Sequence, residues 1–286
     1  MIIDGKIIAE KIKKELIEKI KTLKSQPELA VILVGKNPAS EIYVSYKQKA
    51  CLEVGIKSHV YHFDKNVSME ALVSKLSELN SNLNIHGILV QLPLSKHLDS
   101  INVLNSINSF KDVDGLHGMN IGWLMHNRPY TIPCTPQGCM ILLKSVINNF
   151  SGLNAVVIGR SVLVGKPMST LLTKENATVT LAHSKTKNLK EICRNADILI
   201  SACGVPKIIT EEHVKKGAVV IDVGISKVDG LTVGDVDFEK VHEKVHAITP
   251  VPGGVGPMTV ACLLKNTVHC YEVLNGVKSP YDHHYE

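Results

Sequence analysis

The chain has 286 residues, of which 44% are hydrophobic and 21% are charged. This composition is typical of a globular protein rather than a disordered one, and the length is natural for two domains. The formal net charge of +5 is small. In the basic N-terminal segment, lysines alternate with glutamates, as in the pairs Glu10–Lys14 and Glu15–Lys19. We interpret this segment as a solvated helix face and not as a nucleic-acid patch.

Seven cysteines at irregular spacings, without a C-x-x-C motif, indicate reduced thiols inside a cell. No apolar run approaches the roughly 18 residues that a membrane span requires. The N-terminal sequence MIIDGKIIAEK lacks the apolar core of a signal peptide. We therefore expect a soluble, cytoplasmic protein that contacts neither membranes nor nucleic acid.

The first half of the chain alternates helix and strand patterns. Apolar stripes predict helices over about 8–23, 38–55 and 68–79, and apolar runs predict strands at 29–34, 58–63 and 88–92. Such alternation predicts a parallel sheet covered by helices.

Residues 154–186 predict a βαβ unit. A β-branched run at 155–158 ends at Gly159, Gly165 and Pro167 open a helix, and a second β-branched run follows at 177–181. The N–H groups at the start of such a helix suit a dinucleotide pyrophosphate. Because only Gly159 and Gly165 stand where the usual G-x-G-x-x-G has three glycines, an ordinary crossover connection stays open as an alternative.

The residues after the second strand of this unit favour NADP over NAD. An NAD enzyme usually has an acidic residue there to bind the ribose 2′-hydroxyl, whereas this chain has His183, Ser184, Lys185 and Thr186. With Arg160 across the turn, the pocket would be cationic and suited to a 2′-phosphate.

The remainder of the second half continues the α/β pattern. It predicts strands at 197–202, 218–223 and 246–249, a hairpin at 226–233, a glycine-rich loop at 250–257 and a helix at 258–274. Two α/β layers in one chain predict two domains, joined at a helix that starts at Thr135 and Pro136.

The second helix carries the strongest catalytic candidate. At 100° per residue, Tyr43, Lys47, Ala50 and Val54 fall within about 60° of one another, so Lys47 lies in an apolar and aromatic stripe. Burial of an ammonium group usually lowers its pKa, and such a lysine acts as an acid or base near neutral pH. A lysine that extends to solvent is the alternative.

One further polar residue, Gln91, lies where ligands bind in α/β folds, and a simple cap or loop residue is the alternative. Gln91 ends a buried strand, and the carboxyl ends of parallel strands border such sites. Asp114 lies in the segment 112–115, whose simplest interpretation is a turn, since the further ligands of a calcium loop are missing.

Histidines elsewhere predict no metal site. Residues 242–246 match H-E-x-x-H, but a short helix there gives way at once to a strand, so both histidines would not share a helix. We interpret His283 and His284 as a solvated chain end.

Several long motifs together resemble the bifunctional methylenetetrahydrofolate dehydrogenase/cyclohydrolase family over nearly the whole chain. They are NPASEIYVSYKQKACLEVG (37–55), GILVQLPL (87–94), KDVDG (111–115), PCTPQG (133–138), VVIGRSVLVGKPMS (156–169), AHSKT (182–186), VIDVGI (220–225) and ITPVPGGVGPMT (248–259).

The resemblance implies NADP-dependent oxidation of 5,10-methylenetetrahydrofolate to the methenyl cation, followed by hydrolysis to 10-formyltetrahydrofolate. It implies an α/β fold of two domains with the folate cleft between them, and a homodimer. We expect a folate-binding catalytic domain at 1–140 plus 264–286 and a Rossmann-like NADP-binding domain with a parallel sheet at 141–263.

The resemblance also implies roles for individual residues. Lys47 would handle protons as water attacks, Gln91 would contact and tune Lys47, Tyr43 would pack on the folate ring, and Asp114 would hydrogen-bond the pterin. The remaining folate contacts would be Val90, Leu92, Pro252, Gly253 and Gly254. The cofactor contacts would be Gly159, Arg160, Ser161, Gly165, Ser184, Thr186 and Ile225.

Other functions stay open at this point. The chain could be a dehydrogenase alone, another two-domain NADP dehydrogenase such as a shikimate dehydrogenase, or a non-catalytic NADP-binding sensor. The sensor predicts loss of Lys47 or Asp114, and both residues are present.

Overall fold

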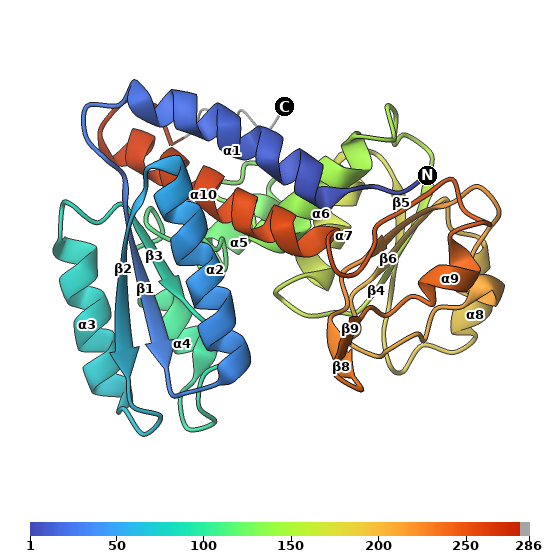
Figure 1. The fold of residues 1–286 in the computed structure, drawn as a ribbon, viewed down its shortest axis with the longest axis horizontal. Helices are drawn as coiled ribbons and strands as arrows, with labels where there is room; N and C mark the ends of the chain where they lie inside the picture. Colours follow the sequence, from blue (N-terminus) through green and yellow to red (C-terminus); the bar gives the residue numbers. More distant parts are fainter. Residues whose placement is uncertain (281–286) are drawn as a thin grey trace. The chain divides into compact units, whose positions relative to one another are not determined.

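The computed structural model describes residues 1–280, so His283 and His284 lie outside the described residues. The backbone divides into two compact units (Figure 1), one of Lys11–Cys134 with Val260–Glu286 and one of Met1–Glu10 with Thr135–Thr259. We call them the β1–β3 unit and the β4–β10 unit. The chain passes between them within α1 (Gly5–Lys21), at the start of α6 (Cys134–Lys144) and within α10 (Val255–Leu274).

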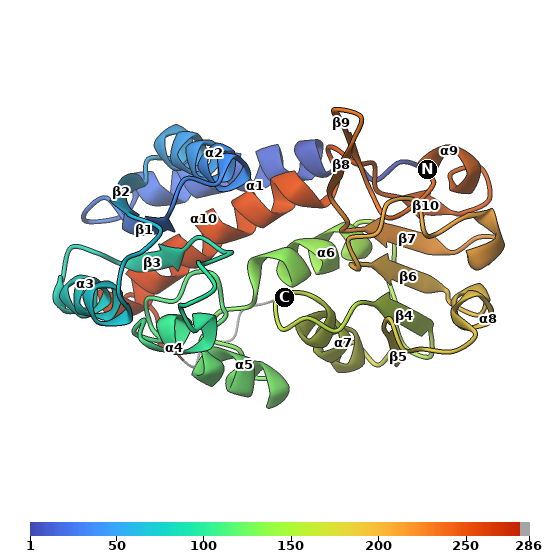
Figure 2. The same cartoon turned by 90° about the horizontal axis from the view of Figure 1, so that it is seen from below.

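The β1–β3 unit is built on a parallel sheet of order β2-β1-β3. Its elements are β1 (Glu28–Val34), α2 (Pro38–Val54), β2 (Lys57–Phe63), α3 (Met69–Ser81), β3 (Gly87–Val90), α4 (Ser100–Asn105) and α5 (Gly118–Met125). Figure 2 shows α2 on one side of this sheet and α3 and α4 on the other.

Residues of both faces of β1 are buried, because helices cover the sheet on both sides. Ala30, Ile32 and Val34 face one core, together with Leu72 and Leu76 of α3. The opposite face of the strand packs against α2, which contacts both β1 and β2. The apolar runs of the sequence therefore form strands that are buried on both sides.

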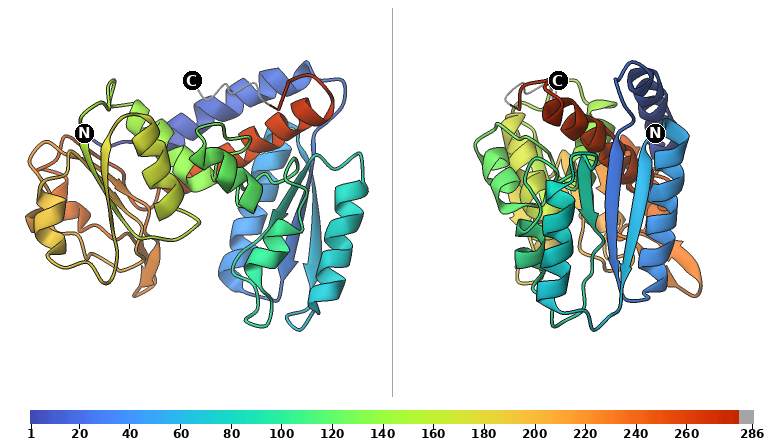
Figure 3. Two further views of the ribbon diagram at one scale, coloured as in Figure 1. Left: turned by 180° about the vertical axis from the view of Figure 1, so that it is seen from behind. Right: turned by 90° about the vertical axis from the view of Figure 1, so that its left-hand side faces the viewer.

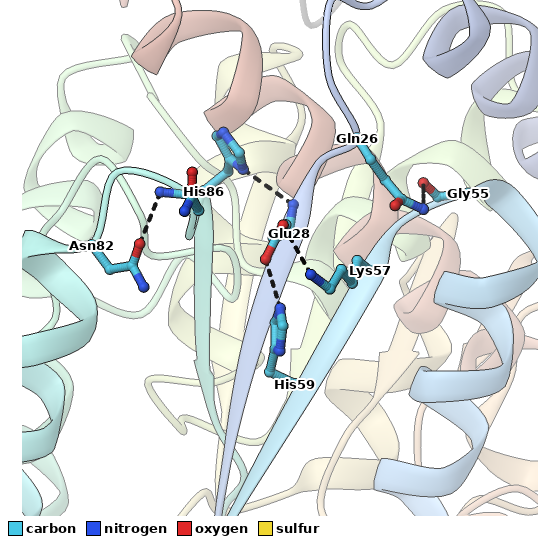
Figure 4. A network of polar contacts seen from close by, with 8 residues as sticks. Gln26, Glu28, Gly55, Lys57, His59, Asn82 and His86 are labelled. Atoms are coloured by element: carbon cyan, nitrogen blue, oxygen red, sulfur yellow. Dashed lines mark hydrogen bonds and ion pairs between the residues drawn. The ribbon is translucent and has the colours of Figure 1, made fainter.

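A polar network closes the amino end of this sheet (Figure 4). The Glu28 carboxylate accepts a hydrogen bond from Lys57 Nζ at 3.4 Å and pairs with His59 Nε2 at 2.6 Å. The Glu28 N–H donates to His86 Nδ1 at 3.1 Å. Glu28 of β1 thus connects to β2 on one side and to the segment before β3 on the other. The carboxyl end of the sheet, where Gln91 follows β3, is left for the site.

The β4–β10 unit is built on a parallel sheet of order β10-β7-β6-β4-β5. Its elements are β4 (Asn154–Ile158), α7 (Gly165–Lys174), β5 (Thr178–Ala182), α8 (Leu189–Arg194), β6 (Ile198–Ser201), η1 (Glu211–His213), β7 (Val219–Asp222), the antiparallel hairpin of β8 (Ser226–Val228) and β9 (Leu231–Val233), α9 (Phe238–Val241) and β10 (Ala247–Ile248). The predicted two-domain α/β fold with parallel sheets is confirmed.

Helices cover both faces of this second sheet, as Figure 3 shows for α7 and α8. Val156 and Ile158 of β4 face a core that includes Cys193 of α8 and Val241 of α9. On the other face, α7 packs against β4 and β5.

The first residues of the chain pair with the last strand of the β4–β10 unit. The Ile3 N–H donates to the Ile248 carbonyl at 2.8 Å, and Ile248 donates to the Met1 carbonyl at 3.0 Å. Sequence analysis groups residues 1–10 with the first domain, whereas these bonds tie them to β10, a partner about 245 residues away that no local pattern reveals. Among residues 1–280, no helix is long and apolar enough to cross a membrane.

Candidate active site

Helix α2 holds Lys47 inside the β1–β3 unit. The helix begins after Asn37, whose side chain accepts hydrogen bonds from the N–H groups of Ala39 and Ser40, and Pro38 occupies the first turn, where its missing N–H costs nothing. Lys47 lies on the buried face with Val44, and only 7% of its surface is exposed. The helix therefore places a lysine among apolar neighbours, and such a group needs a polar partner.

Gln91 is that partner. Lys47 Nζ donates to Gln91 Oε1 at 3.0 Å. The other end of the same amide is also held, since Gln91 Nε2 donates to the Leu92 carbonyl at 2.8 Å. The Gln91 N–H donates to Ile32 of β1 at 2.9 Å, so the residue continues the sheet just past the end of β3 at Val90. Backbone and amide together fix the oxygen that faces Lys47.

Tyr43 lies one turn before Lys47 on α2. Its side chain is at the edge of the buried face, with 39% exposed, and burial of part of the ring raises the pKa of the phenol. Val90 is buried and Leu92 is half-buried, and the peptide bond between Leu92 and Pro93 is cis.

Asp114 lies on a loop that Asp112 organises from beneath. Asp112 is fully buried, and its carboxylate accepts from the N–H groups of Gly115 (3.1 Å) and His117 (2.8 Å) and from Asn120 Nδ2 (2.8 Å). Burial raises the pKa of this carboxyl group. Asp114, two residues on, is half-buried. Of the two aspartates in this turn, one builds the loop and the other is available to a ligand.

The same loop is anchored on α10 by Asn266. Its Nδ2 donates to the carbonyls of Val113 at 2.9 Å and Ile132 at 3.0 Å. Gly115 has a φ of +70°, and an added Cβ would lie 2.6 Å from the Ile132 carbonyl carbon. The backbone on both sides of Asp114 is therefore fixed.

The charges of Lys47 and Asp114 both affect the pKa of the Cys134 thiol. Burial raises the pKa of this thiol well above its usual range, the Asp114 carboxylate adds to the rise, and the Lys47 ammonium opposes it. The structure joins Lys47 to Gln91 by a hydrogen bond and places Tyr43 one turn before Lys47 on α2. Asp114 lies on a separate loop of the same unit.

A glycine turn follows β4 in the other unit. Gly159 has a φ of +116°, and an added Cβ there would lie 2.3 Å from the Ala202 carbonyl oxygen. An added Cβ at Gly165 would lie 1.8 Å from the Gly159 carbonyl oxygen. Only glycine fits at either position, which is what a backbone turn that admits a phosphate closely requires.

Polar side chains border this turn. Ser161 Oγ accepts from the Val164 N–H at 3.1 Å, which holds the turn that precedes α7. Arg160, Ser184 and Lys185 are exposed. The Thr186 hydroxyl accepts from the His183 N–H at 2.8 Å, so it shapes the turn after β5. Exposed cations at Arg160, between β4 and α7, and at Lys185, after β5, fit a phosphorylated ribose.

The remaining predicted contacts also lie in the β4–β10 unit. Ile225 follows β7 and is 49% exposed. The Val251–Pro252 peptide is cis, and Gly254 N–H donates to the Pro250 carbonyl at 2.9 Å. Gly253 has a φ of +109°. The predicted site residues therefore form two groups, one in each unit.

The H-E-x-x-H segment is not one helix, because α9 ends at Val241 and His246 lies next to β10. Within residues 1–280, no group of three or more His, Cys, Asp and Glu side chains could hold a metal ion.

Sequence reasoning missed the supporting residues, above all Asp112, Asn266, Asp222 and Asp235. A signal existed for the third, since an aspartate ends the otherwise apolar strand β7. Asn266 had none, because it lies inside a long helix and about 150 residues from the loop that it holds.

Two family models match this chain. The catalytic domain of the tetrahydrofolate dehydrogenase/cyclohydrolase family matches residues 3–114, and the NAD(P)-binding domain of the same family matches residues 133–275. The chain belongs to this family.

Relatives in this family match the sequence of this chain over nearly its whole length. The bifunctional protein FolD of Pelagibacter ubique is 50% identical over 276 residues, which cover 95% of this chain and 98% of the relative. FolD of Thermodesulfovibrio yellowstonii is 52% identical over 272 residues, 94% of this chain and 95% of the relative.

Solved structures of the family have the same fold. The FolD methylenetetrahydrofolate dehydrogenase/cyclohydrolase of Campylobacter jejuni superposes with a TM-score of 0.93 at 49% identity, covering 95% of this chain and 98% of that one. The Trypanosoma brucei enzyme, solved with NADP and an inhibitor, gives a TM-score of 0.91 at 40% identity, covering 98% and 99%.

Proposed function

We propose that this chain oxidises 5,10-methylenetetrahydrofolate with NADP and then hydrolyses the methenyl product to 10-formyltetrahydrofolate. Membership of the tetrahydrofolate dehydrogenase/cyclohydrolase family supports both activities. The observation that carries the second activity is the bond from buried Lys47 to Gln91. A sensor without chemistry would have no use for a buried ammonium group held in one orientation.

NADP is the proposed cofactor of the β4–β10 unit. The glycine turn fits the pyrophosphate, because Gly159 and Gly165 leave no room for a side chain. Arg160 and the segment 184–186 fit the 2′-phosphate, Ser161 the phosphates, and Ile225 the nucleoside. When bound, NADP supplies the hydride acceptor, and the protein contributes positioning.

The folate is proposed to bind next to the lysine. Tyr43 would pack on the flat ring, and the half-buried Asp114 would accept hydrogen bonds from the pterin. Val90 and Leu92 would line its apolar side, and Pro252, Gly253 and Gly254 would contribute backbone from the loop before α10. The folate would thus belong mainly to residues 1–140 and 264–286, and the cofactor to residues 141–263.

Lys47 is proposed as the general acid and base of the hydrolysis. Water adds to the methenyl carbon, the bond from that carbon to the ring nitrogen breaks, and one proton is released overall. In its neutral amine form, Lys47 would take one proton from the attacking water and then give it to the departing nitrogen, while the second proton of the water is released to solvent. Gln91 would keep Nζ pointed at the reacting carbon, because both ends of its amide are fixed.

The test is Lys47→Ala, with Lys49→Ala as the control because Lys49 is exposed on the same helix. We expect methenyl hydrolysis to fall at least about a hundredfold, since general acid–base catalysis contributes that much. Reduction of NADP should fall only modestly, because hydride transfer needs no protein base. Both rates are followed by absorbance. If Lys47→Ala hydrolyses the methenyl compound at the wild-type rate, the assignment of Lys47 is wrong.

We also propose a cytoplasmic homodimer. No cysteine among residues 1–280 is in a disulfide bond, as is usual in a reducing compartment. Sedimentation velocity of the purified protein at micromolar concentration would measure the mass in solution, and a species of one chain would refute the dimer.

A further inference from the structure

Two buried aspartates of the β4–β10 unit have no part in the proposed chemistry. Asp222 ends β7 and Asp235 follows β9, and they are 3% and 0% exposed. Such carboxylates are costly to bury unless donors surround them. Their contacts show what they hold.

Asp235 holds the segment after β6. Its Oδ2 accepts from the N–H groups of Cys203 at 2.8 Å and Gly204 at 3.2 Å, and from Ser201 Oγ at 3.0 Å. The Cys203 thiol donates to the same oxygen at 3.3 Å. All these donors come from one short stretch, so Asp235 fixes the course of the chain as it leaves β6.

Asp222 holds Asp235 in turn. Its Oδ1 accepts from the N–H groups of Gly224 and Asp235, both at 3.0 Å, and its Oδ2 accepts from the Val236 N–H at 2.8 Å. The packing around Asp235 is tight, because an added Cβ at Gly224 would lie 2.1 Å from Asp235 Oδ1. The two aspartates therefore link the segments that follow β6 and β7 through hydrogen bonds.

The segment after β6 in turn supports the glycine turn that follows β4. The Ala202 N–H donates to the Ile158 carbonyl at 2.8 Å, and the Ala202 carbonyl lies where a side chain of Gly159 would be. Contacts thus run without interruption from Asp235 through residues 202–204 to the turn that follows β4.

The strand order tells which half of the cofactor lies here. Strands β5 and β6 flank β4 on opposite sides. With the 2′-phosphate at the end of β5 and the pyrophosphate at the glycine turn after β4, the nicotinamide half extends over the ends of β6 and β7, because dinucleotides lie across the carboxyl ends of such sheets.

We infer that Asp235 is a positioning residue for the nicotinamide half of NADP, acting through the backbone of Cys203 and Gly204 and held in place by Asp222. The inference rests on the proposed NADP-dependent function. It predicts that loss of the Asp235 carboxylate impairs binding of the nicotinamide half of NADP and leaves binding of the 2′-phosphate half unchanged.

The decisive variant is Asp235→Leu, which keeps the branched shape of the side chain and removes the acceptor. We expect KM for NADP to rise about tenfold or more and kcat of NADP reduction to fall, since misplacement of a reacting group is costly. Hydrolysis of methenyltetrahydrofolate, which needs no hydride acceptor, should keep its rate. The ratio of kcat/KM for NADP to that for NAD should stay unchanged, because the 2′-phosphate lies at β5.

Two further variants separate positioning from general damage. Asp235→Asn retains one oxygen for the Cys203 and Gly204 N–H groups, so it should restore most of the wild-type KM even if Asp235→Leu does not fold. Asp237→Asn is the matched control, because Asp237 lies in the same segment and pairs only with the exposed Lys240, at 3.1 Å, among the ion pairs of residues 1–280. It should behave as the wild type.

Calorimetry tests the inference independently of activity. Asp235→Leu should weaken binding of NADP about tenfold and leave binding of 2′,5′-ADP, which lacks the nicotinamide half, unchanged. Equal loss for both ligands, or no loss for either, overturns the inference. A wild-type protein that binds NADP and does not reduce it would refute the proposed activity alone, and this comparison of ligands would still decide the role of Asp235.

Discussion

Asp222 illustrates how one buried side chain makes stability depend on pH. Burial raises the pKa of its carboxyl group to about 7, the N–H groups of Val236 and Asp235 oppose the rise, and the neighbouring Asp235 carboxylate adds to it. Between pH 4 and pH 7 the folded state binds a proton here that the unfolded state has lost. The contribution of Asp222 to stability is therefore present at low pH and is lost as pH rises toward about 7.

The variant Asp222→Asn does not titrate, so the difference between wild type and variant isolates this effect. We expect the free energy of unfolding of the wild type, relative to the variant, to fall by about 2–3 kcal/mol from pH 5 to pH 8. Urea unfolding at four pH values in this range measures it. A difference that is constant with pH would show that Asp222 has an ordinary pKa in the folded state.

At the scale of residues, the sequence predicted the candidate site side chains better than the buried residues that hold the surrounding loops in place. Helical periodicity sufficed to place Lys47 on the buried face of α2, and the end of a buried strand sufficed to single out Gln91. Asp112 lay in a segment predicted as a simple turn, and Asp235 drew no prediction, because their partners are mainly backbone N–H groups, which a sequence does not distinguish. The roles of all these residues stay predictions.

At the scale of elements, α2 depends on its first turn. The Asn37 side chain accepts from Ala39 and Ser40 at 3.0 and 3.2 Å. We expect Asn37→Ala to lower the free energy of unfolding by about 1 kcal/mol, since two N–H groups lose their acceptor. Asn37→Asp, which keeps the acceptor and adds a charge that suits a helix start, should be as stable as the wild type. Thermal unfolding of the three proteins measures the order, and an alanine variant as stable as the wild type would show that water replaces the cap.

Long helices were predictable, and three short ones were not. The β-branched runs and the helices of α1, α2, α3 and α7 follow from periodicity, whereas α4, α5 and α8 span only six to eight residues, too few for a pattern to repeat. Helix α10 begins at Val255, inside the predicted glycine-rich loop. Pro257 lies in its first turn, where proline is compatible with a helix, so the glycine and proline pattern placed the start of the helix too late.

At the scale of the whole molecule, His269 and Asp222 give the two units opposite contributions to the pH dependence of stability. His269 of α10 lies in the β1–β3 unit, and burial, followed by the charge of Lys278, lowers its pKa to about 4. As pH falls below about 6.5, the unfolded state takes up a proton that the folded state refuses. His269 therefore lowers the stability of the β1–β3 unit as pH falls from about 6.5 to about 4, the range in which Asp222 raises that of the β4–β10 unit.

His269 should consequently make the β1–β3 unit more sensitive to acid. We expect core amides such as that of Leu264 to lose about 2 kcal/mol less hydrogen-exchange protection between pH 7 and pH 5 in His269→Gln than in the wild type, and amides of β6, such as that of Ile200, to be unaffected by the variant. His62→Gln, at an exposed position, should behave as the wild type at both amides. An equal effect of His269→Gln on both amides would mean that the two units unfold as a single cooperative body, because a local pKa can bias one unit only where that unit opens on its own.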